Sequence, residues 1–171
     1  MKSTSAFIAA ALAFGVIGTA SAQSNGLSGF SARVGVFYPT ADSARQISRT
    51  WFGAGLDYKL RDLSSLSSDT YKASLGISID FYNRDDFRVV PVLATYTGNL
   101  SDRFYYIGGA GVAFTRIPTG NTVDERARFA YMFGLGYNLA QGPNPIFVEA
   151  RFFGNDKTQA NGFGLYAGIR F

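Results

Sequence analysis

The segment "YKASLGISIDF", from Tyr71 to Phe81, constrains the fold of this chain more than any other stretch. Its odd-numbered positions carry Tyr, Ala, Leu, Ile, Ile and Phe, while Lys, Ser, Gly, Ser and Asp occupy the even-numbered ones. Side chains that alternate in this way lie on opposite faces of a β-strand. In a chain with 47% apolar residues, an alternation of this length arises by chance in fewer than about one window in a thousand. The segment therefore predicts a strand with one apolar face.

The same period of two recurs in further segments along the chain. These segments are 30–38, 51–60, 88–97, 105–115, 128–139, 146–153 and 163–171. Pro91 lies inside the fourth strand of the series and should interrupt its hydrogen-bond ladder, because proline has no N–H. The connections are short and rich in turn residues, such as "NRDD" and "QGPNP", which suits hairpins between antiparallel neighbours. The sequence thus predicts an all-β, eight-stranded antiparallel up-and-down barrel.

Such a barrel can direct its apolar stripes either inward or outward. A secreted, soluble, lipocalin-like barrel places them inside, around a hydrophobic ligand, whereas a transmembrane barrel places them outside, in lipid. Here the second face is poor in side-chain volume, since it carries many glycines with Ser and Ala. These glycines are Gly53, Gly55, Gly76, Gly109, Gly111, Gly134, Gly136, Gly164 and Gly168.

Small residues have little use on a water-facing surface but fit the narrow interior of an eight-stranded barrel. Tyr and Phe also gather near the ends of the apolar stripes, as the aromatic girdles of membrane barrels require. These patterns favour a transmembrane barrel, and the soluble ligand-binding barrel remains the alternative.

Charged residues on the glycine-rich face have mixed signs. They are Arg33, Asp57, Lys59, Lys72, Asp80, Arg128, Glu149, Arg151 and Arg170. Because isolated buried charges are costly, we expect these side chains to form a network of ion pairs in the lumen. A carboxylate pair for acid–base catalysis is the competing interpretation of Asp57, Asp80 and Glu149.

The amino terminus has the pattern of an export signal. Lys2 precedes the uncharged apolar run from Ala6 to Gly18, and "ASA" then offers a cleavage site before Gln23. The apolar run is shorter than the roughly 20 residues of a spanning helix. We therefore expect a cleaved signal peptide over 1–22, a short lead over 23–28 and the barrel over 29–171.

Composition excludes several classes of activity. The chain has no cysteine and no histidine, so disulfides, thiolate metal sites and familiar hydrolytic triads are impossible. No basic cluster predicts nucleic-acid binding, and the glycine pairs are not followed by the helix that a dinucleotide site needs. The sequence predicts a non-enzymatic protein without a metal or cofactor.

Three stretches carry a resemblance to a known family. "YYIGGAGVAF", "FVEARFF" and the final "LYAGIRF" resemble strands of the small bacterial outer-membrane β-barrels, the OmpA/OmpX/OmpW-like superfamily. The likeness covers roughly Gly29 to Phe171. The sequence departs from the OmpA pattern in having no peptidoglycan-binding domain after the expected barrel.

This resemblance implies an outer-membrane location, outer-membrane lipid and lipopolysaccharide as surroundings, and a monomeric state. It also implies that the insertion machinery and periplasmic chaperones assist assembly, with the last strand as assembly signal. The signal residues would be Phe163, Leu165, Ile169 and Phe171.

The expected role is structural, surface-interacting or that of a narrow channel. The connections 40–50 and 116–126 are expected on the extracellular side. The arginines there could meet lipopolysaccharide phosphates, or could simply be solvated. They are Arg45, Arg49, Arg116 and Arg126.

Overall fold

The computed structural model describes residues 29–171, except 69–70, 120–121, 141 and 143. The predicted signal peptide and lead, residues 1–28, lie outside the described residues. Among the residues described, no helix has both the length and the apolar character needed to cross a membrane.

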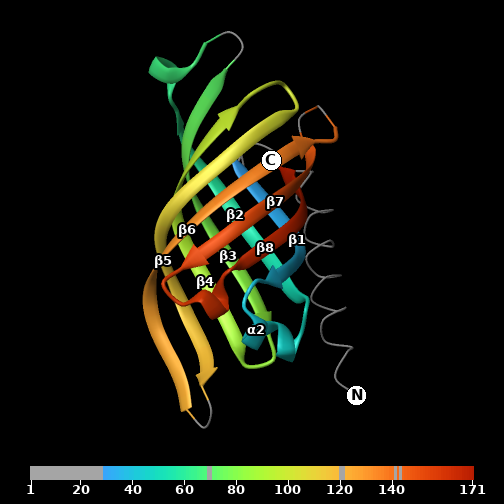
Figure 1. The fold of residues 1–171 in the computed structure, drawn as a ribbon. Helices are drawn as coiled ribbons and strands as arrows, with labels where there is room; N and C mark the ends of the chain where they lie inside the picture. Colours follow the sequence, from blue (N-terminus) through green and yellow to red (C-terminus); the bar gives the residue numbers. More distant parts are fainter. Residues whose placement is uncertain (1–28, 69–70, 120–121, 141, 143) are drawn as a thin grey trace.

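Eight strands form one closed antiparallel barrel in sequence order, which confirms the predicted up-and-down fold (Figure 1). They are β1 (Phe30–Pro39), β2 (Trp51–Asp62), β3 (Lys72–Arg84), β4 (Phe87–Asn99), β5 (Phe104–Thr119), β6 (Thr122–Asn138), β7 (Ile146–Asn155) and β8 (Gly162–Arg170). Three short helical segments join them: α2 (Asp42–Ile47), η1 (Ser64–Leu66) and η2 (Thr158–Ala160).

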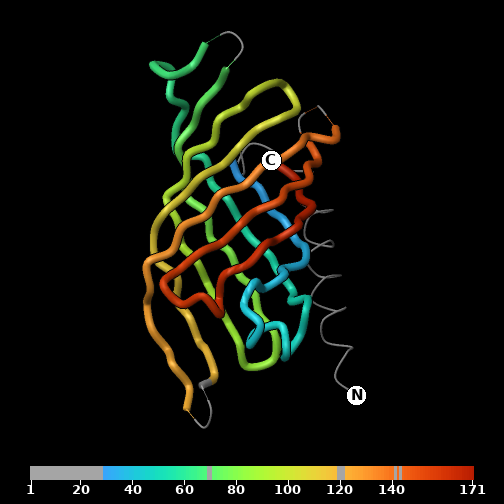
Figure 2. Tube along the Cα trace, in the orientation of Figure 1, coloured from blue at the N-terminus to red at the C-terminus, as the bar shows by residue number. Residues whose placement is uncertain are grey.

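The barrel closes where the first strand meets the last, and Figure 2 shows the two running side by side. Their register runs from Ser31 opposite Arg170 to Pro39 opposite Gly162. Closure leaves neither strand with an open edge over this range, which removes the usual route to edge-to-edge aggregation.

The two ends of the barrel differ, and we name them by the chain. The terminal end holds Phe30, Phe171 and the connections β2–β3, β4–β5 and β6–β7. The distal end holds the other four connections, including the turn at Asp85, whose φ of 50° is left-handed.

Pro91 has the predicted effect on one side only. The β3–β4 register passes from Ile79 opposite Val92 to Tyr82 opposite Val89, without pairs between them. On the other side, Pro91 stays in register with Ala113 of β5. The backbone N–H of a residue in a strand points toward only one of the two neighbouring strands. The missing N–H of proline therefore explains a gap on one side of β4 alone.

The predicted distal connections differ from the observed ones. Residues 116–126 were expected as a loop, but β5 and β6 continue as a hairpin to Thr119 and Thr122. This hairpin projects beyond the other strands at the distal end (Figure 1). Connection 40–50 contains α2, whose Ala44 is fully buried.

The apolar stripes face outward. Leu56, Ile79, Phe133 and Leu165 are between 47% and 61% exposed, although they are large and apolar. Alternating with them, side chains such as Asp80 and Arg151 are buried in the lumen. The observed orientation is therefore the one that a transmembrane barrel needs, and the reverse of a soluble ligand-binding barrel.

Candidate functional site

The middle of the lumen contains a buried cluster of charged side chains, which we call the ion cluster. Its members are Arg33 from β1, Asp57 from β2, Ser78 and Asp80 from β3, and Glu149 and Arg151 from β7. All are at lumen-facing positions of their strands. Side chains from strands that are distant in sequence thus meet in the interior of the barrel.

Arg33 holds the β2 and β3 side of the cluster. Its guanidinium donates to Asp57 Oδ2, to Asp80 Oδ1 at 2.5 Å and to Ser78 Oγ at 3.0 Å. The hydroxyl of Ser78 in turn donates to Asp80 Oδ2 at 2.8 Å. Charge-assisted bonds of this kind are the strong ones, so they fix the positions of three strands relative to one another.

Arg151 makes the corresponding contacts from β7. Its Nε donates to Glu149 Oε2 at 2.6 Å, and its Nη2 donates to Asp57 Oδ2 at 3.1 Å. Glu149 also accepts a hydrogen bond from the Tyr105 hydroxyl at 2.8 Å. Both arginines therefore share Asp57, which makes the cluster one network rather than separate pairs.

The cluster is not neutral when all its groups are ionised, because three carboxylates face two guanidiniums. The Arg33 and Arg151 side chains are fully buried, while that of Asp57 is 18% exposed. Arg33 Nε lies 4.0 Å from Glu149 Oε2 and has no hydrogen-bond partner among the residues that the structure describes. Since unpaired buried charge is expensive, the network can persist only while both arginines remain in place.

Glycines make room for these long side chains. A Cβ added to Gly55 would lie 2.5 Å from Arg33 Nη2 and 2.5 Å from Asp80 Oδ1. One added to Gly134 would lie 2.8 Å from Arg151 Cγ. The glycine-rich face therefore serves large neighbours, and does not simply fit a cramped lumen.

Large aromatic side chains fill the distal half of the lumen, and we call them the aromatic core. They are Phe37, Trp51, Tyr82, Phe87, Phe153 and Tyr166, each at most 5% exposed. Phe37 stacks on Tyr82 with ring centroids 4.1 Å apart, and Trp51 packs on Phe87 at 5.3 Å.

Helical segments cover the aromatic core at its distal side. Ala44 of α2 and Ala160 of η2 are fully buried against it. The Tyr82 hydroxyl donates to the carbonyl of Ala160 at 3.0 Å, and Trp51 Nε1 donates to that of Ser48 at 3.0 Å. The distal half of the barrel is thus packed like a protein core.

This aromatic core was not predicted from the sequence. Phe37 shares the lumen-facing register of Arg33, Trp51 that of Gly53, and Tyr82 that of Asp80. On β1, β2, β3 and β7, the available signal was a large aromatic residue near the distal end of the stripe that carries glycine or charged residues.

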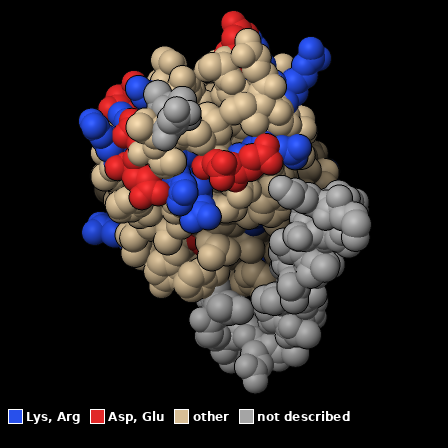
Figure 3. Space-filling model, turned by 90° about the horizontal axis from the view of Figure 1, so that it is seen from below, with Lys and Arg blue, Asp and Glu red and all other residues tan. Residues whose placement is uncertain are grey.

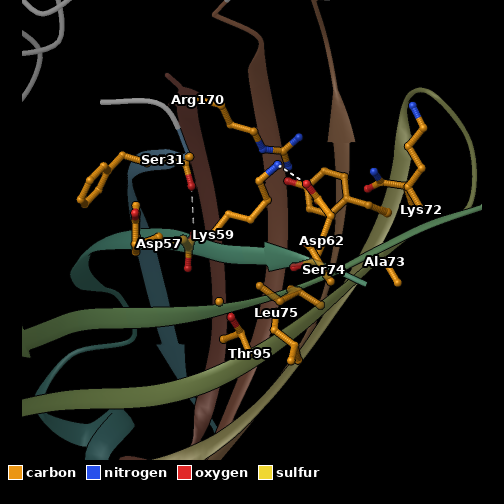
Figure 4. Close-up of a pocket in the computed structure, with 18 of the residues that line it drawn as sticks. Ser31, Asp57, Lys59, Asp62, Lys72, Ala73, Ser74, Leu75, Thr95 and Arg170 are labelled. Atoms are coloured by element: carbon orange, nitrogen blue, oxygen red, sulfur yellow. Dashed lines mark hydrogen bonds and ion pairs between the residues drawn. The ribbon is translucent and has the colours of Figure 1, made fainter. Parts of the chain in front are cut away.

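The terminal half of the lumen is open, and we call this pocket of about 510 Å³ the vestibule. Asp57 and Glu149 form its floor, and Tyr105 and Ile107 line its side. Figure 4 shows Lys59 and Arg170 entering the space from β2 and β8, with Lys72 on its opposite side. The lumen therefore has three layers: the aromatic core, the ion cluster and the vestibule.

The nine charged residues predicted to share a network fall into three places. Arg33, Asp57, Asp80, Glu149 and Arg151 form the ion cluster. Lys59, Lys72 and Arg170 line the vestibule, where Lys59 pairs with Asp62 at 3.2 Å. Arg128 lies at the distal end, where it binds Asp124 at 2.6 Å and Asp156 at 3.3 Å.

Three of the four distal arginines bind carboxylates of the protein itself. Arg116 pairs with Glu125 at 3.2 Å, Arg126 with Asp124 at 3.1 Å, and Arg45 with Asp42. The hydrogen bond to Asp42 raises the pKa of Arg45. Figure 3, a view onto the distal end, shows basic and acidic side chains intermingled rather than gathered by sign.

The residues of the predicted assembly signal lie on the outward face of β8 and at its end. Phe163 and Leu165 are 56% and 61% exposed, and Ile169 and Phe171 are partly exposed. The Phe171 N–H donates to the Phe30 carbonyl at 2.8 Å, so the end of the chain is bound to β1.

Three tyrosines meet on the outside near the terminal end. The Tyr71 hydroxyl lies 2.7 Å from that of Tyr106 and 2.6 Å from that of Tyr96. Hydrogen bonding to Tyr106 and Tyr96 raises the pKa of Tyr71. Such amphipathic side chains suit a boundary between lipid and water.

Fold and lumen together define a small closed antiparallel barrel with an apolar exterior and a three-layered interior. The solved structures that are similar in fold include two outer membrane proteins. The outer membrane protein Ail of Yersinia pestis, determined in a phospholipid bilayer nanodisc, matches with 14% identity and a TM-score of 0.48 over 83% of this chain and 98% of Ail. The outer membrane enzyme PagL matches with 14% identity and a TM-score of 0.49 over 83% of this chain and 99% of PagL. No family model and no curated protein matches the sequence.

Proposed function

We propose that this chain is an integral, non-enzymatic β-barrel of the bacterial outer membrane, with a structural or surface-interaction role. One observation carries the proposal: a closed barrel exposes large apolar side chains over most of its outer wall. Soluble proteins rarely expose contiguous apolar surface of this extent, whereas lipid requires it. Each strand has at least nine residues, which is the length that a tilted strand needs to span a bilayer.

In this orientation the terminal end faces the periplasm and the distal end faces outward. An even number of strands places both chain ends on one side, and a chain inserted from the periplasm keeps them there. Outer-membrane lipid and lipopolysaccharide then surround the barrel, and the insertion machinery and periplasmic chaperones deliver it. The protein is proposed to be a monomer.

The narrow-channel role that the sequence leaves open is the least supported of the three. The aromatic core fills the distal half of the lumen, and the ion cluster fills its middle. An ion crossing the barrel would have to displace both layers. We therefore propose that the barrel does not conduct in its folded state.

The non-enzymatic part of the proposal rests on the chemistry available in the lumen. The chain has neither histidine nor cysteine, and each carboxylate of the ion cluster is bound by an arginine. A paired carboxylate is poorly placed to take up or release a proton in a reaction.

Refolding of residues 23–171 tests the proposal directly. A band that migrates fast in SDS when it comes from detergent micelles, and is lost on boiling, would support a lipid-facing barrel. Folding in plain buffer without detergent would refute it in favour of the soluble ligand-binding barrel. Planar-bilayer recordings of the folded protein should then show no steady current, and a stable conductance would contradict the closed lumen.

A further inference from the structure

Arg170 is a fixed cation at the side of the vestibule. Its guanidinium carbon lies 4.3 Å from the centre of the Tyr105 ring and 4.9 Å from that of Phe147. Its Nη1 donates to Asn138 Oδ1 at 2.8 Å. No carboxylate of the described residues lies within 4 Å of the guanidinium, so its charge is held in place without being neutralised by an ion pair.

Two lysines add positive charge to the same space. Within the ranges that the structure describes, Lys72 makes no ion pair. Lys59 pairs only with Asp62, at 3.2 Å, and the two side chains are 50% and 71% exposed. Because an exposed pair of this kind is weak, Lys59 can exchange Asp62 for a ligand at little cost.

The wall formed by β3 and β4 offers uncharged hydrogen-bonding groups. They belong to Ser74, Thr95, Thr97 and Asn99. In the described part of the chain, these four side chains make no hydrogen bond to the protein. Their hydroxyl and amide groups are therefore available to a ligand or to water.

The floor sets the direction in which a ligand would enter. Asp57 and Glu149 belong to the ion cluster, which has one more carboxylate than it has guanidiniums. An anionic group is repelled from this floor and attracted to the three cations nearer the opening. A ligand with one anionic end and one uncharged polar end fits this arrangement.

We propose that the vestibule is a binding site for a small polyhydroxylated anion, such as a sugar that carries a carboxylate or a phosphate. Lys59 and Arg170 bind the anionic group, Lys72 adds positive charge from the opposite side of the vestibule, and the β3–β4 wall binds hydroxyl groups. The volume of about 510 Å³ lies within the range of small-molecule sites. The proposal depends on the proposed function only for the compartment that the pocket faces.

Calorimetric titration of the folded protein in detergent micelles tests this site with named probes. Glucuronic acid and glucose 6-phosphate supply the two anionic groups, glucose is the neutral control, and inorganic phosphate lacks the polyol. We expect both anionic sugars to bind at least about tenfold more tightly than glucose or phosphate. If only one of them binds, the anionic group of the ligand is identified.

A pair of matched double variants separates the pocket from the general charge of this end. Lys59→Gln with Lys72→Gln removes two cations of the vestibule and should weaken binding by about tenfold or more. Arg61→Gln with Arg103→Gln removes two exposed cations outside the pocket and should leave the affinity unchanged. The heat-sensitive fast band verifies folding of every variant, independently of binding.

Three outcomes would overturn the proposal. One is the absence of saturable binding of either anionic sugar below about 10 mM, a range in which weak sites are still detected. The second is equal affinity for one of the controls. Binding of glucose as tight as that of the anionic sugars would leave no role for the cations, and binding of phosphate that tight would leave no role for the β3–β4 wall. The third is equal weakening in both double variants, which would attribute binding to the net charge of the terminal end.

Discussion

Replacing Arg151 by methionine should destabilise the barrel far more than replacing an arginine at its surface. Methionine keeps the apolar stem of the side chain but removes the guanidinium. Arg151 donates to Glu149 at 2.6 Å, to Asp57 at 3.1 Å and to Ser78 at 3.2 Å. After the substitution, three carboxylates would face the single guanidinium of Arg33.

Removing one partner of a buried ion pair costs about 3–5 kcal/mol, because the remaining charge stays buried. We expect a loss of this size in the free energy of unfolding. Water from the vestibule reaches Asp57, whose side chain is 18% exposed, so the lower part of the range is the better estimate. Arg116→Met is the matched control, since Arg116 and Glu125 are 45% and 63% exposed and such pairs contribute at most about 1 kcal/mol.

The assay is urea unfolding in phosphatidylcholine vesicles, followed by the fluorescence of Trp51. This residue is the sole tryptophan of the chain and is 1% exposed in the aromatic core, so unfolding transfers it to water and shifts its emission to the red. Adding Glu149→Gln to Arg151→Met removes one excess carboxylate and should restore more than about 1 kcal/mol. If Arg151→Met cost no more than Arg116→Met, the cluster would not be a buried, coupled network, and the reasoning would fail.

Three further perturbations test other parts of the structure. Gly55→Ala should cost about 1–3 kcal/mol, because its Cβ would lie 2.5 Å from Arg33 and Asp80, whereas Gly108→Ala, with its nearest neighbour at 4.0 Å, should be nearly neutral in the same urea assay. Phe37→Ala should cost about 3–5 kcal/mol through loss of its stacking on Tyr82 and the cavity left behind, and a loss below that of Gly108→Ala would contradict a packed distal half. The pKa of Tyr71 is higher in the folded than in the unfolded state. The protonated Tyr71 therefore adds to the free energy of unfolding below the unfolded pKa of about 10, and this stabilisation is lost as the pH rises through the folded pKa. Tyr106→Phe should reduce this alkaline loss of stability, and identical pH profiles of variant and parent would argue against the tyrosine contact.

The strands and their order could be predicted from the sequence, because alternation survives wherever one face is apolar. Tyr71 to Phe81 is the clearest case, since its lipid-side and lumen-side residues differ at every position. Pro91 was also informative, because its missing N–H acts locally and independently of the rest of the fold. The outward direction of the stripes followed from glycine on the other face, although the reason is the space needed by Arg33 and Arg151.

What could not be predicted depends on contacts across the barrel. Residues 116–126 have a polar composition typical of loops, yet pairs such as Arg116 with Glu125 allow a two-stranded hairpin to continue beyond the barrel. Charged residues on the lumen-facing side of the strands also lie at different levels along the barrel axis. Arg33 and Arg151 reach the ion cluster, whereas Arg128, on the same kind of face, lies at the distal end. A register irregularity between Lys59 and Arg61 brings Asp62 into the vestibule, and a strict period of two misses it.

The fit between glycines and long side chains has a consequence for the descent of this barrel. In three places a glycine on one strand leaves the space that a long side chain of the neighbouring strand fills. The pairs are Gly55 with Arg33, Gly134 with Arg151, and Gly136 with Tyr105. A larger residue at the glycine is tolerated only after its partner has become smaller, and a shortened partner leaves a void that a larger residue can fill. Among related barrels these positions should therefore change together, so pairs of substitutions would trace the interior of the fold even where single positions have diverged beyond recognition.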